Sequence, residues 1–169
     1  MRIKMILTDV DGCLTDGSVY YGPNHEKFKK FNMQDGMAVK MLKHNKILVG
    51  VISSDDSMAT KYRMEDLKFD IICIDVKDKL EKLKEILYYY NVDAEEVAYM
   101  GDDIQDLDVI KEVSFSVAPN NAVESVKEKV NYVTKKCGGE GAFREFVEKI
   151  IEMNGGDISE GCSISTNKT

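Results

Sequence analysis

Residues 3–17 read IKMILTDVDGCLTDG, an apolar run that is followed at once by Asp9, Asp11 and Asp16. A short apolar run of this kind predicts a buried strand. Carboxylates that lie close together repel one another and are costly to remove from water, so a positive charge must offset them. A divalent cation is the commonest candidate, and we expect the rest of the chain to supply its other ligands.

Four more short apolar runs follow, separated by helical patterns. The clearest helical pattern is the last, where apolar residues recur at i, i+3, i+4, i+7 and i+8 from Phe143 to Ile151. Strands that alternate with helices predict an α/β fold, a Rossmann-like parallel sheet flanked by helices. The four runs are ILVGVI (47–52), DIICI (70–74), VAYM (97–100) and SFSV (114–117).

One segment interrupts this alternation. Residues 17–32, GSVYYGPNHEKFKKFN, predict two short strands around a Gly-Pro-Asn turn, a β-hairpin inserted after the first strand. The insertion is too small to form a domain, so we expect one domain over residues 1–153. Residues 154–169 contain few large apolar side chains and are expected to form a mobile tail.

Composition excludes several classes of function. The chain has 169 residues, is 43% hydrophobic and carries a formal charge of −7, so a nucleic-acid partner is not expected. No apolar run approaches the roughly 18 residues of a membrane span, and the N-terminus lacks a secretory pattern, so we expect a cytoplasmic protein. The four cysteines are widely spaced without a CxxC motif, which predicts reduced thiols rather than a zinc site or disulfides.

Polar side chains follow the predicted strands. In an open parallel sheet the functional residues lie at the carboxyl ends of the strands. Mg²⁺ suits this edge, because it prefers oxygen ligands and takes one or two carboxylates together with phosphate oxygens. Bound Mg²⁺ would reverse the local charge, and a lysine with a serine hydroxyl would complete a phosphoryl clamp. The residues at this edge are Asp9, Asp11, Ser53, Ser54, Asp55, Asp56, Lys77, Lys79, Asp102, Asp103 and Asp106.

An aspartate in such a site can itself attack phosphorus. The resulting aspartyl-phosphate splits one difficult displacement into two easier ones. A second carboxylate two residues further on can protonate the leaving oxygen and then activate water. Asp9 and Asp11 have this spacing, so the acidic cluster can serve as a metal site and a nucleophile together.

These residues resemble a known family. DVDGCLTDG, the serine at the end of the second strand, Lys79 and GDDIQD resemble the four motifs of the haloacid dehalogenase superfamily of Mg²⁺-dependent phosphatases. KFNMQDGMAVKML, YMGDDIQDLDVI and GGEGAFREFVEKI resemble its 3-deoxy-D-manno-octulosonate 8-phosphate phosphatase branch, over roughly residues 3–153. That branch also contains phosphatases of nine-carbon sialic-type acids and the C-terminal domains of some CMP-sialic acid synthetases.

The resemblance implies a role for each matching residue. Asp9 is the implied nucleophile and Asp11 the general acid/base. Mg²⁺ would be held by Asp9, Asp102 and the main-chain carbonyl of Asp11. The phosphoryl group would be held by Ser53, Ser54 and Lys79, with Asp103 and Asp106 as supporting residues.

The resemblance also implies an assembly. In this branch a short hairpin takes the place of a large cap domain, and the hairpins of four subunits build a central barrel. We therefore expect a homotetramer in which a neighbouring subunit covers each active site. The implied substrate is a phosphorylated ulosonic acid such as 3-deoxy-D-manno-octulosonate 8-phosphate.

Two departures from the branch leave the substrate open. Many members have Thr-Gly-Arg after the second strand and Gly-Gly-Arg-Gly near the last helix, where this chain has Asp55 and Glu140 in place of arginine. An acid cannot supply the planar, charged fork that binds a carboxylate, so the carboxylate of the sugar acid would be held differently here. An acidic residue after the second strand also occurs in the nine-carbon members of the branch, so the resemblance leaves a nine-carbon sugar-acid 9-phosphate as an alternative substrate. Two alternative functions are a non-catalytic oligomerisation module and a phospho-receiver domain. The complete set of acids and lysine disfavours the module, and the order of the motifs disfavours the receiver.

Overall fold

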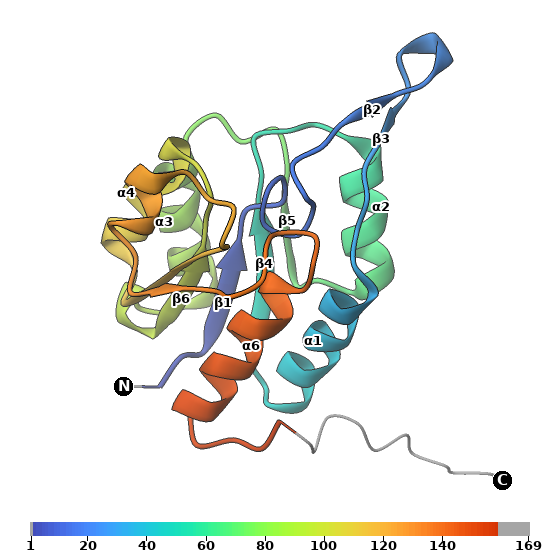
Figure 1. Ribbon diagram of the computed structural model, residues 1–169. Helices are drawn as coiled ribbons and strands as arrows, with labels where there is room; N and C mark the ends of the chain where they lie inside the picture. The colour runs from blue at the N-terminus through green and yellow to red at the C-terminus, as the bar shows by residue number, and fades with distance from the viewer. Residues whose placement is uncertain (1, 159–169) are drawn as a thin grey trace, which may run out of the picture.

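The computed structural model describes residues 2–158 and has a parallel sheet at its centre (Figure 1). The strand order is β5-β4-β1-β6-β7-β8, the doubly wound order typical of nucleotide-binding folds, and the predicted α/β class is confirmed. The two-residue strand β8 was not predicted. The strands are β1 (Met5–Thr8), β4 (Leu48–Ile52), β5 (Ile71–Cys73), β6 (Val97–Met100), β7 (Phe115–Ala118) and β8 (Tyr132–Val133).

Strand β1 lies in the middle of the sheet and pairs with β4 on one side and β6 on the other. In this register Thr8 lies opposite both Val51 and Met100. The loops that follow these three strands therefore leave the sheet at the same level. The register brings the segments after residues 8, 52 and 100 to one edge of the molecule.

Helices cover both faces of the sheet (Figure 1). Alternate side chains of β1 point to opposite faces, so Ile6 packs in the core beneath α1, α2 and α6, whereas Met5 and Leu7 pack beneath α3 and α4. Because both faces are buried, the central strands β1, β4 and β6 are almost entirely apolar. The helices are α1 (Met33–His44), α2 (Met58–Leu67), α3 (Lys79–Tyr90), α4 (Leu107–Glu112), α5 (Glu124–Lys127) and α6 (Ala142–Met153).

The predicted hairpin is present as a separate two-stranded sheet that projects from the body (Figure 1). Its strands are β2 (Tyr20–Tyr21) and β3 (Lys27–Phe28), which are antiparallel. A short 3₁₀ turn at Pro23–His25 joins them, in the predicted Gly-Pro-Asn region. An isolated bridge between Thr15 and Phe31 closes the base of the hairpin.

The two ends of the folded body meet at Asn154. Its side chain accepts a hydrogen bond from the main-chain nitrogen of Ile3 (2.9 Å) and donates one to the carbonyl of the same residue (2.8 Å). The predicted tail begins here, and its residues 159–169 lie outside the described residues. None of the helices within residues 2–158 combines the length and apolar character needed to cross a membrane.

Candidate active site

Asp9 follows β1 directly and is held at the edge of the sheet. Its main-chain nitrogen donates to the carbonyl of Met100 (2.9 Å), which continues the pairing of β1 with β6 by one residue. The side chain is 3% exposed. One carboxylate oxygen accepts a hydrogen bond from the nitrogen of Val10 (2.7 Å), and the other lies 2.9 Å from the Nζ atom of Lys79. The carboxylate is therefore fixed in orientation and partly neutralised.

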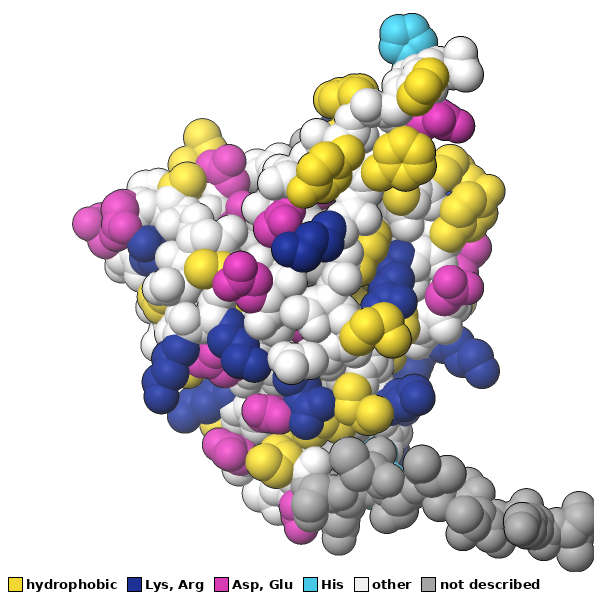
Figure 2. Space-filling model, turned by 45° about the vertical axis from the view of Figure 1, so that its right-hand side comes forward, with side chains coloured by type: hydrophobic (Ala, Val, Ile, Leu, Met, Phe, Trp, Pro, Cys, Tyr) yellow, Lys and Arg dark blue, Asp and Glu magenta, His cyan; other side chains and the backbone are white. Residues whose placement is uncertain are grey.

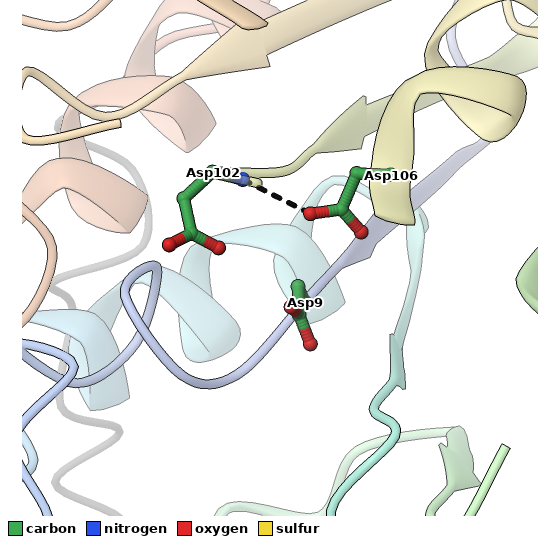
Figure 3. Close-up of side chains that lie close together, drawn as sticks. All are labelled: Asp9, Asp102 and Asp106. Atoms are coloured by element: carbon green, nitrogen blue, oxygen red, sulfur yellow. Dashed lines mark hydrogen bonds between the residues drawn. The ribbon is translucent and has the colours of Figure 1, made fainter. Parts of the chain in front are cut away.

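Asp106 holds the centre of the site together. It is fully buried, and its Oδ1 atom accepts hydrogen bonds from Lys79 Nζ (2.7 Å) and the hydroxyl of Tyr99 (2.7 Å). Its Oδ2 atom accepts from the main-chain nitrogens of Asp102 (3.1 Å) and Asp103 (3.3 Å), the first of which is drawn in Figure 3. Both oxygens of Asp106 are thus occupied by protein donors, so this residue positions Lys79 and the loop after β6.

Lys79 reaches the site from the first turn of α3, which begins after the N-cap residue Asp78. The Asp78 side chain accepts a hydrogen bond from the nitrogen of Glu81 and so fixes the start of the helix. The lysine is 4% exposed and touches the carboxylates of both Asp9 and Asp106. Burial acts to lower the pKa of Lys79, but these two charges raise it above its ordinary value, so the ammonium stays charged.

Three carboxylates converge where a cation would bind (Figure 3). Asp9, Asp102 and Asp106 each offer one oxygen, and these oxygens lie within 4.8 Å of one another. Within residues 2–158, the Asp102 carboxylate receives one hydrogen bond, from the thiol of Cys13 at 3.9 Å, so its oxygens remain available. The donor set fits a hard divalent cation held by Asp9 and Asp102, with Asp106 in support.

The electrostatics of the site agree with this fit. Burial, together with the neighbouring charge of Asp106, raises the pKa of Asp9 to about 6 despite the opposing effect of Lys79. Burial, followed by repulsion from Asp9 and Asp106, raises the pKa of Asp102 to about 7. One ammonium does not balance three carboxylates, and a divalent cation would remove the excess negative charge.

The predicted phosphate ligands lie along the same edge. Ser53, which is 1% exposed, comes directly after β4, and its hydroxyl accepts a hydrogen bond from the nitrogen of Asp55 (3.3 Å). The hydroxyl of Ser54 donates to the side chain of Gln105 (3.1 Å), in the turn after β6. Asp103 differs from these residues, since its exposed side chain caps the nitrogen of Ile104 (2.7 Å) and does not join the carboxylate cluster.

The side chain of Asp11 turns toward the hairpin. Its Oδ2 atom lies 2.6 Å from the Nζ atom of Lys29, and its Oδ1 atom accepts a hydrogen bond from the hydroxyl of Thr15 (3.3 Å). Lys29 was missed by the sequence analysis. Lys29 is one of four charged residues of the hairpin, a pattern that predicts a solvent-exposed surface. The alternation that puts Lys27 and Lys29 on one face was the only sign in the sequence that Lys29 has another role.

Comparison with known proteins identifies relatives along most of the chain. The haloacid dehalogenase-like hydrolase family matches residues 56–145. The 3-deoxy-D-manno-octulosonate 8-phosphate phosphatase of Haemophilus influenzae is 37% identical over 154 residues, which cover 91% of this chain and 86% of that protein. The Yersinia pestis enzyme of the same name is 34% identical over 150 residues, covering 89% and 80%.

Solved structures show the same likeness. A probable YrbI family phosphatase from Pseudomonas syringae superposes with a TM-score of 0.91 at 36% identity, covering 94% of this chain and 90% of that one. The Moraxella catarrhalis 3-deoxy-D-manno-octulosonate 8-phosphate phosphatase, solved with a magnesium ion, a phosphate ion and the sugar acid, gives a TM-score of 0.88 at 32% identity, covering 90% and 88%.

With this sheet, this carboxylate cluster and these relatives, the chain belongs to the haloacid dehalogenase-like hydrolases. Within them it falls in the 3-deoxy-D-manno-octulosonate 8-phosphate phosphatase branch, as its motifs predicted. It is therefore a phosphatase, rather than a receiver domain or a non-catalytic module.

Proposed function

We propose that this phosphatase hydrolyses 3-deoxy-D-manno-octulosonate 8-phosphate, with Mg²⁺ as cofactor and Asp9 as nucleophile. The observation that carries the proposal is the buried Asp9 carboxylate, fixed between Lys79 and Val10 and facing the oxygens of Asp102. The names of the curated relatives supply the substrate. The mechanism and the substrate are thus argued from different observations and can be tested separately.

In the first step an Asp9 oxygen attacks phosphorus. The bond between phosphorus and the sugar oxygen breaks, and Asp11, in its protonated form, donates a proton to that leaving oxygen. The phosphoryl group becomes attached to Asp9. Lys79, with the hydroxyl of Ser53, would stabilise the negative charge on the phosphoryl oxygens.

In the second step water releases the phosphate. Asp11, now a carboxylate, takes a proton from water, and the water oxygen attacks phosphorus. The bond between phosphorus and Asp9 breaks, which restores the Asp9 carboxylate and liberates inorganic phosphate. Asp11 regains its proton in this step, so the enzyme returns to its starting state.

The cation would be held by Asp9, Asp102 and the main-chain carbonyl of Asp11. Bound Mg²⁺ would supply the positive charge that lets an anionic phosphate approach an anionic nucleophile. Asp106 would act through its contacts, because its four hydrogen bonds hold Lys79 and the start of the Asp102 loop in place.

A nine-carbon sialic-type acid 9-phosphate is the second candidate substrate. It is favoured by Asp55, the acidic residue that follows β4 at a position where many members of the branch have arginine. The reaction would be the same for both substrates. Only the groups that recognise the sugar would differ, and these lie outside the phosphoryl-transfer residues.

We also propose that the enzyme works as a homotetramer assembled through its hairpins. The hairpin carries exposed apolar side chains, and Figure 2 shows such side chains gathered along the projecting arm. A two-stranded hairpin is marginal in water by itself, and an apolar patch of this kind is typical of an interface. The exposed residues are Val19 (41%), Tyr20 (54%), Tyr21 (73%) and Phe28 (54%).

The function is tested by measuring phosphate release from both candidate substrates, with added MgCl₂ and with EDTA. We expect Mg²⁺-dependent turnover of one of them, and loss of at least about 10³-fold in Asp9→Asn, since an amide cannot act as the nucleophile that forms the acyl phosphate. Asp108→Asn, which makes the same change at an exposed residue paired with Lys111, is the matched control. Turnover by Asp9→Asn at the level of the control would contradict the mechanism.

The assembly is tested independently by size-exclusion chromatography with light scattering, which measures the molar mass of the protein as it elutes. A mass of four chains is expected for the unsubstituted protein. Tyr20→Ser combined with Tyr21→Ser should lower that mass, because the apolar contact area is lost. A monomer at the concentration of the assay, with full activity, would exclude the tetramer.

A further inference from the structure

Lys29 is a buried cation in an otherwise exposed hairpin. It directly follows β3, yet its side chain is only 1% exposed. The ammonium lies 2.6 Å from Asp11 Oδ2, 2.7 Å from Asp55 Oδ2 and 3.2 Å from the hydroxyl of Thr60. A lysine ammonium has three donor hydrogens, and each of them has one acceptor here. The side chain is therefore held in a single orientation.

These contacts join four separate segments at one atom. Asp11 belongs to the loop after β1, Asp55 to the loop after β4, and Thr60 to the buried face of α2. Lys29 itself belongs to the hairpin. Besides the isolated bridge at its base and the exposed ion pairs of Lys27 and Lys30, the hairpin thus contacts the site through a buried ammonium that touches the proposed acid/base directly.

Asp11 is held from two sides in this arrangement. Lys29 contacts one carboxylate oxygen, and the hydroxyl of Thr15 donates to the other at 3.3 Å. The Asp11 side chain remains 31% exposed, so without these partners solvent could accommodate several of its rotamers. A group that transfers a proton must lie in one geometry relative to the leaving oxygen, and a displacement of about 1 Å can cost about 100-fold in rate.

Asp55 is committed to the protein's own donors. Its Oδ2 atom contacts Lys29 and accepts a hydrogen bond from the nitrogen of Ser57 (3.0 Å), while Oδ1 lies 3.4 Å from Lys27 Nζ. Its main-chain nitrogen donates to the hydroxyl of Ser53 (3.3 Å). An acid bound in this way serves to hold Lys29 and leaves little capacity for a ligand.

We propose that Lys29 and Asp55 are positioning residues for Asp11: the ammonium fixes the acid/base, and Asp55 fixes the ammonium. This inference rests on the proposed function, since it assigns Asp11 its proton-transfer role. It gives the acid at position 55 a task within the protein instead of a contact with the sugar. It also makes the placement of the hairpin a determinant of turnover.

The test compares Lys29→Met, Asp55→Ala and the double variant in steady-state hydrolysis of whichever candidate substrate the unsubstituted protein turns over. Methionine keeps the length of the buried side chain without its charge. We expect kcat to fall at least tenfold in each variant, with KM within about twofold of the original value. The double variant should lose no more than the single variants, because both changes break one chain of contacts.

Two controls accompany these variants. Lys30→Met makes the same change at the next residue, whose side chain is 58% exposed and pairs with Asp16, and it should leave kcat unchanged. Lys29→Arg retains charge and donors and should restore part of the lost kcat. Thermal unfolding of each variant establishes that it is folded. If Lys29→Met does not fold, the inference is tested with Asp55→Ala alone, because Asp55 is partly exposed.

The outcomes separate this inference from the function on which it rests. A rise in KM with unchanged kcat would mean that Lys29 or Asp55 binds the substrate, and would overturn the positioning role. Unchanged kcat and KM, or independent losses that multiply in the double variant, would overturn it as well. Absence of turnover by the unsubstituted protein would overturn the proposed function itself, and this inference with it.

Discussion

Gly12 passes so close to Asp102 that a Cβ atom at Gly12 would lie 2.0 Å from the Asp102 Oδ2 atom. Gly12 also has a φ of +83°, a backbone conformation that residues other than glycine rarely adopt. The absence of a side chain at this position therefore gives the Asp102 carboxylate its place beside Asp9. The glycine in the first motif serves the metal site as well as the turn.

Gly12→Ala is expected to displace Asp102 and weaken Mg²⁺ binding at least tenfold, with a comparable loss of activity. Gly17→Ala is the matched control, since Gly17 has a φ of +79° but its nearest atoms to an added Cβ lie 3.7 Å away. Both variants should lose about 1–2 kcal/mol of unfolding free energy through backbone strain. Titration calorimetry with MgCl₂ measures the difference, and equal Mg²⁺ affinity in the two variants would contradict the role given to Gly12.

Mg²⁺ affinity should increase as the pH rises from 6 to 8. Without the ion, the pKa of Asp102 lies at about 7 and that of Asp9 at about 6, so both groups bind protons more readily than ordinary aspartates. The cation binds their deprotonated forms, so below pH 7 it must displace a proton, and affinity should fall about tenfold for each pH unit. Calorimetric Kd values at pH 6 and 8 test this. Asp108→Asn should show the same dependence, and Asp102→Asn should lose the site.

Asp35 should make stability depend on pH. Its Oδ1 atom accepts a hydrogen bond from the nitrogen of Arg144 (3.1 Å), while Oδ2 is the one buried side-chain oxygen or nitrogen without a partner among the described residues. Burial raises the pKa of Asp35 to about 6, against the lowering effect of the Arg144 hydrogen bond and of nearby cations. The folded state therefore binds a proton more tightly than the unfolded state, and stability should fall as the pH rises from about 4 to about 6.

Asp35→Asn isolates this effect. At pH 7 the variant should be the more stable protein by up to about 3 kcal/mol, the equivalent of the raised pKa, and the difference should shrink toward zero at pH 4. Urea unfolding of both proteins at the two pH values measures it, and the other titrating groups cancel in the comparison. A difference that did not change with pH would show that the Asp35 carboxylate does not titrate as its surroundings indicate.

Elements with a strong apolar pattern could be predicted from the sequence. The strands around 3–7, 47–52, 70–74, 97–100 and 114–117 were each placed to within two residues, because a sheet covered on both faces needs continuous apolar runs. Strand β8 has two half-buried residues and offers no such run. Helix α2 buries only Thr60 and Met64, so it lacks the apolar stripe by which α6 was recognised.

The site divides in the same way. The register of the parallel strands fixes where each loop begins, so the side chains that follow the strands meet at the carboxyl edge of the sheet. The order of the strands alone therefore implies the cluster of Asp9, Lys79, Asp102 and Asp106. The position of Asp103 depends on the local conformation of a 3₁₀ turn, which no spacing rule predicts. Lys29 meets Asp11 and Asp55 across 18 and 26 residues, a pairing that depends on how the hairpin folds back.

The two hydrogen bonds between Asn154 and Ile3 have a consequence for circular permutation of the chain. Since two hydrogen bonds hold these residues together, a short linker could join them and make the polypeptide circular without stretching the fold. New termini could then be opened at the exposed Asn91, in the turn between α3 and β6 at the amino end of the sheet. Such a permuted chain would leave both the catalytic edge and the hairpin in place, because neither contains a new terminus.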